Sequence, residues 1–162
     1  MILDFDLDFL RAAVALVDER LERLDGKADV SPDPDAFGVF DQAEYITGFG
    51  FVACQTYATA VVSRSKLDKQ RALALGPKHR KGRSMLQLIN AAANHWKHSS
   101  EWSVNAPAPH AKQTLDVISS LGVDTNGSYP LATTLYEILA PYPTRFANLI
   151  LFLTQWRDVL PR

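Results

Sequence analysis

Residues 83–102 carry the clearest alternation of hydrophobic and polar positions in the chain. Hydrophobic side chains return there every three or four residues, which is the spacing of a helix with one face in a core. The apolar stripe of such a helix consists of Met85, Leu88, Ile89, Ala92 and Trp96. The opposite stripe consists of Arg83, Gln87, Asn90, Asn94, Lys97 and Glu101, with His98 at its edge and His95 on its flank. We therefore predict one helix that contributes both to the core and to a polar site.

The same periodicity predicts the rest of the fold. Six further segments show it, at residues 5–25, 41–64, 65–76, 109–122, 130–141 and 144–156. Local signals predict where some of them begin or end: Gly26 as a stop, Asp41 with Glu44 as a capping box, and Thr144 as a cap. No stretch alternates with period two for long enough to form a strand. We therefore predict an all-α single domain over residues 1–162, a bundle of about six to seven helices.

Composition narrows the class of protein. The 162 residues are enough for one domain, and 47% hydrophobic with 22% charged residues is ordinary for a soluble globular protein. A single cysteine, Cys54, excludes an internal disulfide framework and a cysteine-rich zinc site. Acidic residues rather than a basic segment follow Met1, and the longest apolar run, 149–153, is too short to span a bilayer. We expect a cytoplasmic protein without a membrane partner.

The net charge of −1 conceals a strong segregation of charge along the chain. Residues 1–44 contain twelve acidic and four basic residues, whereas residues 64–83 contain eight basic residues and one acid, Asp68. We expect residues 77–82 to form an exposed and mobile basic loop. Its cations are Lys78, Arg80 and Lys81. Such a run can contact nucleic-acid phosphates, although it lacks the interleaved aromatic residues that stack single-stranded bases. The alternative is a solvated loop that balances the acidic N-terminal helix, within the molecule or across a dimer.

The polar stripe within residues 83–102 is the candidate site. Asparagines on a partly buried helix face are costly unless they bond to something. One interpretation makes His95 or His98 a general base or acid. The groups that would then hold an anionic substrate are Asn90, Asn94, Arg83 and Lys97. The other interpretation is a solvated or structural face, with His95 at the boundary of the core.

Metal chemistry is not expected at this stripe. His95, His98 and Glu101 follow one another at three-residue spacing, but no second helix carries a paired carboxylate–histidine motif. Glycine-rich phosphate loops are absent, as are Gly-x-Ser-x-Gly and Cys–His nucleophile signatures. The candidate chemistry therefore uses no metal and no cofactor.

Residues 89–95, Ile-Asn-Ala-Ala-Ala-Asn-His, resemble the late-helix motif of the HEPN superfamily of compact helical bundles. That motif is an arginine followed a few residues later by a histidine, and Asn90 stands here in the place of the arginine. Residues 97–102, Lys-His-Ser-Ser-Glu-Trp, are similar to the way such helices run out into a loop. The resemblance implies a HEPN-like bundle and RNA as the partner, in a toxin–antitoxin or defence setting. The replaced arginine leaves both a catalytic and a non-catalytic relative open.

Two functions from different classes follow. The first is a protein that binds RNA and, in a catalytic version, cleaves it as a metal-independent endoribonuclease, with His95 or His98 taking the proton of a ribose 2′-OH. The second is a non-enzymatic interaction module that pairs with a second copy or a cognate protein. A solvent-open cleft with both histidines facing it favours the first. A polar stripe bonded to another helix favours the second.

Overall fold

The fold is a bundle of seven α-helices without a strand in the part of the chain that the structure covers. This computed structural model describes residues 4–102 and 107–161. The α-helices are α1 (Phe5–Val30), α2 (Val39–Ser63), α3 (Lys69–Ala74), α4 (Met85–His98), α5 (Pro109–Ser119), α6 (Pro130–Leu139) and α7 (Leu149–Asp158). Two short 3₁₀ helices, η1 (Ser99–Glu101) and η2 (Phe146–Asn148), extend α4 and precede α7. The prediction of an all-α single-domain bundle is confirmed.

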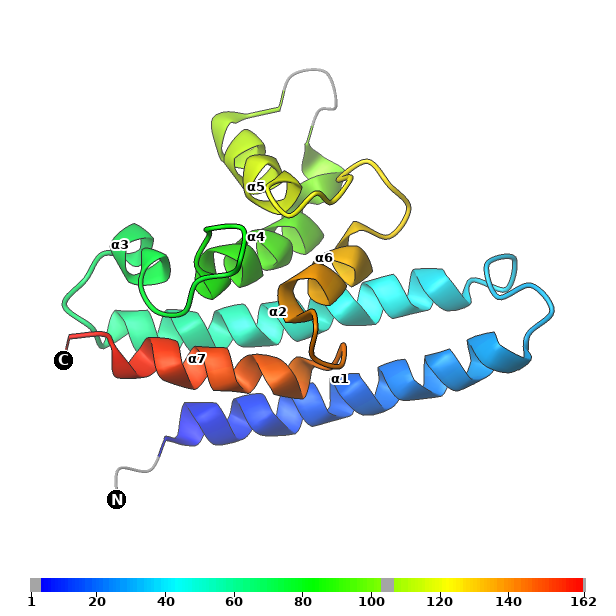
Figure 1. Ribbon diagram of the computed structural model, residues 1–162, viewed down its shortest axis with the longest axis horizontal. Coiled ribbons are helices and arrows are strands. Elements are labelled where there is room, and N and C mark those ends of the chain that lie inside the picture. The colour runs from blue at the N-terminus through cyan, green and yellow to red at the C-terminus, as the bar shows by residue number, and fades with distance from the viewer. Residues whose placement is uncertain (1–3, 103–106, 162) are drawn as a thin grey trace.

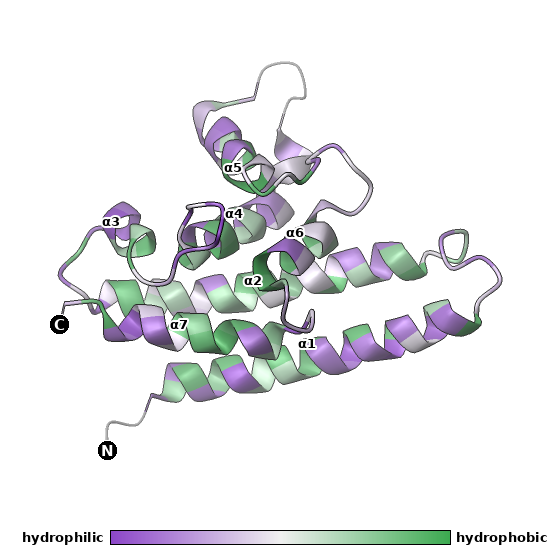
Figure 2. Ribbon diagram, viewed as in Figure 1, coloured by the Kyte–Doolittle hydropathy of each residue, from purple (hydrophilic) through white to green (hydrophobic). Residues whose placement is uncertain are grey.

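The helices form layers stacked on a long hairpin. α1 and α2 run antiparallel, α7 lies along them at the end where both chain termini are found, and α4 and α6 cover the other side of α2 (Figure 1). α5 lies outermost, beyond α4. Hydrophobic residues dominate α2 and the sides of the helices that face it, whereas α1 and α5 alternate with polar positions (Figure 2). α4 is thus held between α2 on one side and α5 on the other.

α2 is the core helix of this arrangement. Phe51 and Cys54 are fully buried on it, and burial followed by the charge of Asp18 raises the pKa of the Cys54 thiol to about 12. Within the described residues, α2 is also the one helix long and apolar enough to cross a membrane. Half of its most apolar window is buried inside the fold, as expected for a helix at the centre of a bundle. The apolar character of α2 is therefore weak evidence that this helix spans a membrane.

The predicted ends of α1 and α2 need correction. Gly26 does not stop α1, which continues to Val30 and ends where Pro32 forces Ser31 into extended backbone, φ −81° and ψ 135°. Asp41 does not open α2, because the helix begins at Val39 after a left-handed Gly38.

Two helix N-termini are capped by carboxylates from distant helices. Glu44 of α2 accepts hydrogen bonds from the backbone N–H groups of residues 131 and 132, at 2.7 and 2.8 Å, at the start of α6. Asp18 of α1 does the same for residues 146 and 147, ahead of α7. The prediction that Thr144 caps the last helix was wrong, since Asp18 satisfies those donors instead.

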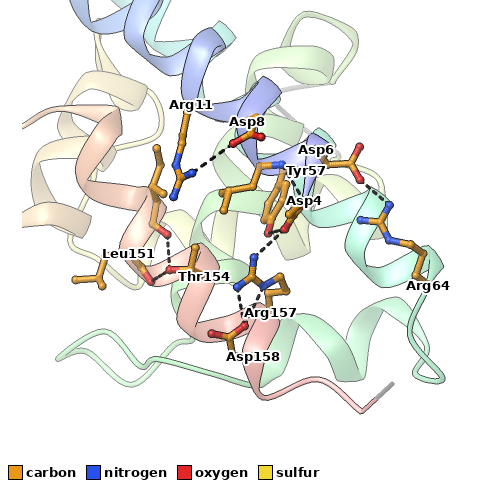
Figure 3. Close-up of polar contacts among 12 residues, drawn as sticks. Asp4, Asp6, Asp8, Arg11, Tyr57, Arg64, Leu151, Thr154, Arg157 and Asp158 are labelled. Carbon is orange, nitrogen blue, oxygen red and sulfur yellow. Dashed lines mark hydrogen bonds and ion pairs between the residues drawn. The ribbon is translucent and has the colours of Figure 1, made fainter. Parts of the chain in front are cut away.

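A closed polar network joins the two ends of the chain. Asp4, which caps α1, accepts hydrogen bonds from Arg157 Nη1 at 2.7 Å and from Tyr57 Oη at 3.2 Å (Figure 3). Arg157 also donates to Asp158 at 2.8 and 2.9 Å. Burial acts to raise the pKa of Asp4, but the bonds from Arg157, Leu7 N and Tyr57 together lower it below 3.8. The network therefore holds α1, α2 and α7 together with each of its charges paired.

α4 is anchored in the core as its pattern predicts. Met85, Leu88, Ile89 and Ala92 are all buried. A capping box formed by Ser84 and Gln87 opens the helix. Trp96 is only partly buried, at the edge of the core, because its indole lies across α2 in the space left by the missing side chain of Gly48.

Candidate functional site

A cleft of about 550 Å³ lies between α4 and α5, on the polar side of α4. Its wall is completed by Gln70 and Leu73 of α3 and by Trp102, directly after η1. The polar and charged residues that line it are Gln70, Arg83, Gln87, Asn90, Asn94, His98, His110, Lys112, Gln113, Thr114 and Asp116. The remaining lining residues are Leu73, Ala91, Trp102, Pro109 and Val117. Arg83, Gln87, Asn90 and Asn94 of the predicted stripe thus line an opening, whereas Lys97 and Glu101 do not.

The two asparagines of the stripe are bonded to α2. Gln55 is buried on α2 and its Nε2 group donates to Asn90 Oδ1 at 2.9 Å and to Asn94 Oδ1 at 2.8 Å. Lys97 Nζ in turn donates to Gln55 Oε1 at 2.7 Å. The stripe is therefore both bonded to a neighbouring helix and exposed to a cleft, so it combines features of a structural and of a ligand-binding face.

His98 is the histidine of α4 that reaches the cleft. Its Nδ1 lies 3.4 Å from Glu101 Oε2, and its side chain is 45% exposed. A carboxylate on one ring nitrogen orients the imidazole and leaves the other nitrogen available to a ligand. His110, at the start of α5, lines the same cleft. The cleft therefore contains two imidazoles from two helices.

His95 lies elsewhere. It is 8% exposed, does not line the cleft, and packs edge-on against Trp102 with ring centroids 5.9 Å apart. Burial lowers the pKa of His95, which favours the neutral ring. Neither His95 Nδ1 nor Trp102 Nε1 has a hydrogen-bond partner within residues 4–102 and 107–161. The two histidines expected to share one site are thus separated, with His95 supporting the wall that Trp102 forms.

Positive charge outweighs negative charge around the cleft. Arg83 and Lys112 line it, and Asp116 is the one carboxylate among its described lining residues. Lys97 lies just behind the asparagines, where burial, and then the charge of nearby Lys69, lowers its pKa. An anionic ligand in the cleft would therefore lie near Arg83 and Lys112 on its wall and near Lys97 behind the two asparagines.

The basic segment at residues 77–82 does not belong to this cleft. Its backbone forms a hydrogen-bonded turn, with His79 N donating to Arg83 O and Gly82 N to His79 O, both at 2.8 Å. Arg80 and Lys81 pair with Glu137 of α6, at 3.3 and 3.2 Å. The cations Lys78, Arg80 and Lys81 are exposed as predicted. The turn is thus bonded to α6 and its charges are partly balanced there, while its mobility and its contact with phosphates stay predictions.

Several residues at the cleft were not among the predicted site residues, and four of them matter most here. Gln55, His110 and Lys112 come from α2 and α5, so no spacing within residues 83–102 reveals them. Trp102 supplies the aromatic surface that the basic segment lacks, yet it is separated from that segment in the sequence. The signal that was available is the polar face of α5, which carries Lys112, Gln113 and Asp116 without an assigned role.

No group of three histidine, cysteine, aspartate or glutamate side chains suited to a metal occurs among the described residues. The groups that line the cleft are imidazole, amide, guanidinium, ammonium and hydroxyl groups and the carboxylate of Asp116.

Comparison with known proteins adds no relative. No protein-family model matches the chain, and neither a curated protein nor a solved structure matches it.

Proposed function

We propose that the protein is a cytoplasmic, HEPN-like helical protein that binds single-stranded RNA in the α4–α5 cleft and cleaves it without a metal. The observation that carries this proposal is the composition of the cleft. Amide and cationic donors from α4 and α5 surround an opening of about 550 Å³, and His98 stands in it with a carboxylate on its Nδ1. Donor groups and positive charge are what phosphate oxygens require.

RNA fits the cleft better than a free anion does. Trp102 lines it and offers an aromatic surface for a base, while Arg83 and Lys112 offer contacts for phosphates. Single-stranded RNA combines unstacked bases with phosphates at the spacing of neighbouring side chains. A duplex would expose few base faces to such an opening.

The imidazoles supply the chemistry for cleavage. His98 Nε2 takes the proton of a ribose 2′-OH, and the 2′-oxygen then attacks the adjacent phosphorus. The bond from phosphorus to the 5′-oxygen breaks, and His110 gives that oxygen a proton. The products are a 2′,3′-cyclic phosphate and a free 5′-OH. Glu101 keeps the His98 ring oriented through Nδ1.

A binding and cleavage assay tests the proposal. Single-stranded RNA, incubated with the protein in a chelator at low salt, should bind and yield cyclic-phosphate ends. A DNA strand of the same sequence should bind without cleavage, because it lacks the 2′-OH. His98→Ala should abolish cleavage and retain the fold, as should His110→Ala. Absence of RNA binding at low salt overturns the proposal, and binding without cleavage reduces it to an RNA-binding protein.

An exposed aromatic patch favours a second function, a non-enzymatic interaction module that forms a homodimer. Tyr45, Phe49 and Trp96 contact one another, with ring centroids 4.9 to 5.5 Å apart, and Tyr45 and Phe49 are 59% and 47% exposed. Exposed aromatic clusters are typical of protein interfaces. Sedimentation of wild type and Phe49→Ser should show a dimer that the substitution weakens. A wild-type monomer at high concentration excludes the dimer.

A further inference from the structure

The hydrogen bonds behind the cleft have a direction, and Lys97 sets it. An ammonium group only donates, so the atom of Gln55 that faces Lys97 Nζ at 2.7 Å is the oxygen Oε1. The Nε2 group of Gln55 then points the other way, toward α4. It donates to Asn90 Oδ1 and Asn94 Oδ1. Each asparagine therefore presents its oxygen to α2.

The other end of each asparagine amide is a donor. Asn90 and Asn94 are one helical turn apart on α4, so their side chains are neighbours, and both line the cleft. Neither Nδ2 group donates to an acceptor in the part of the chain that the structure describes. With both oxygens bonded to Gln55, the Nδ2 groups are the ends left for the cleft. Its floor consequently offers two adjacent N–H donors and no asparagine acceptor.

We propose that Lys97 acts through Gln55 to hold the amides of Asn90 and Asn94 with both Nδ2 groups toward the cleft, and that this donor pair is a subsite for the oxygens of a phosphate group. The subsite rests on the proposed function only for the source of that phosphate, an RNA strand, because inorganic phosphate has the same chemistry. Lys97 and Gln55 are positioning residues, since neither lines the cleft. Arg83 and Lys112, on the walls of the cleft, supply positive charge that balances the negative charge of a bound phosphate.

Gln55→Glu reverses the direction of the hydrogen bonds to Asn90 and Asn94, because glutamate has almost the same shape as glutamine but cannot donate. A carboxylate only accepts, so the asparagines must turn their Nδ2 groups toward α2 and their oxygens toward the cleft. Gln113→Glu is the matched control, because it adds the same charge at the wall of the cleft without touching the network. The Kd for inorganic phosphate and for short single-stranded RNA should rise at least about tenfold more in Gln55→Glu than in Gln113→Glu.

Substitutions of Lys97 test whether its hydrogen bond to Gln55 orients the two asparagine amides. Lys97→Met removes the donor that holds Gln55, whereas Lys97→Arg keeps a donor and the charge. Lys69→Met removes a neighbouring charge that does not bond to Gln55 and controls for electrostatics. Phosphate binding should fall in Lys97→Met, be kept within about threefold in Lys97→Arg, and change little in Lys69→Met.

The deciding measurement is the side-chain amide signals of Asn90 and Asn94 in NMR spectra during titration with inorganic phosphate and, separately, with short RNA. Both signals should shift in wild type and in Gln113→Glu, and neither should shift in Gln55→Glu. Thermal melts check that each variant is folded. If Gln55→Glu does not fold, the comparison of Lys97→Met with Lys97→Arg decides.

The outcomes separate the subsite from the proposed function. Amide shifts with phosphate but no RNA binding support the subsite and overturn the function. RNA binding that leaves both amide signals in place overturns the subsite and supports the function. Equal phosphate affinity in Gln55→Glu and Gln113→Glu, or in Lys97→Met and Lys97→Arg, also overturns the subsite.

Discussion

Two polar networks in this molecule each join neighbouring helices, but they end differently. The network of Asp4, Tyr57 and Arg157 joins α1, α2 and α7, and each charged group in it faces an opposite charge (Figure 3). The network of Gln55, Lys97 and the two asparagines joins α2 to α4, but the chain of bonds stops at the cleft with donor groups left over. The first network is closed, and the second is open.

The difference separates a structural role from a binding role. Burial and the Asp4 carboxylate raise the pKa of Tyr57 to about 12, so its hydroxyl remains a donor within the closed network. Each charge of that network is already paired, so we expect its loss to affect stability rather than binding in the cleft. The open network fixes the orientation of groups that face solvent, which is how proteins hold a binding site ready. Each of the following substitutions tests one side of this comparison.

The largest expected effect is on binding at the open network. The double variant Arg83→Gln, Lys112→Gln should lower affinity for single-stranded RNA by about ten- to a hundredfold, because it removes two phosphate contacts. It should also reduce the dependence of affinity on salt. Titrations at several salt concentrations measure both, and thermal melts should coincide with those of wild type. Unchanged affinity would mean that the cleft is not the RNA site.

The closed network should show the opposite behaviour. Arg157→Met removes the cation that pairs with Asp4 and Asp158, so the free energy of unfolding should fall by about 1–3 kcal/mol while RNA binding stays the same. The pKa of Asp4 is lowered in the folded state, so its contribution is present above pH 3.8 and is lost as the pH falls through the folded value. Urea unfolding of both proteins should therefore differ at neutral pH and converge in acid. A difference that persists in acid would contradict this account.

A smaller, pH-dependent effect is expected from His95 behind the wall of the cleft. Its pKa is below the ordinary value of 6.5 because of burial, so the folded protein binds that proton less readily than the unfolded chain. Stability should be complete above pH 6.5 and decline as the pH falls below it. His95→Phe keeps an aromatic ring against Trp102 and removes the titration, so its melting temperature should fall less than that of wild type between about pH 7 and pH 5. Parallel melting curves would show that His95 does not titrate in this way.

The smallest effect is expected at the basic turn. Lys78→Gln with Arg80→Gln should change RNA affinity by less than about threefold, since both cations lie outside the cleft and Arg80 already pairs with Glu137. The sequence alone suggests that this basic segment contacts nucleic-acid phosphates. A large loss of affinity in this variant would support that expectation and extend the binding surface to α6.

The helices, and the face of α4 that enters the core, follow from the amino-acid sequence alone. Periodic apolar positions report burial directly, so the pattern suffices to assign Met85, Leu88, Ile89 and Ala92 to the core. The same pattern locates the polar stripe that lines the cleft. It fails where a distant group caps a helix, as ahead of α7, where Asp18 of α1 takes the role expected of Thr144.

What the polar stripe contacts is a property of the packed helices. His95 and His98 are three residues apart and separated by only about 60° around α4. The packing of the neighbouring segments decides that one is buried against Trp102 and the other faces the cleft. Gln55, His110 and Lys112 join the site from helices that folding brings alongside α4. A periodic pattern records which side of a helix is buried, whereas the partner of a polar group depends on which helix packs beside it.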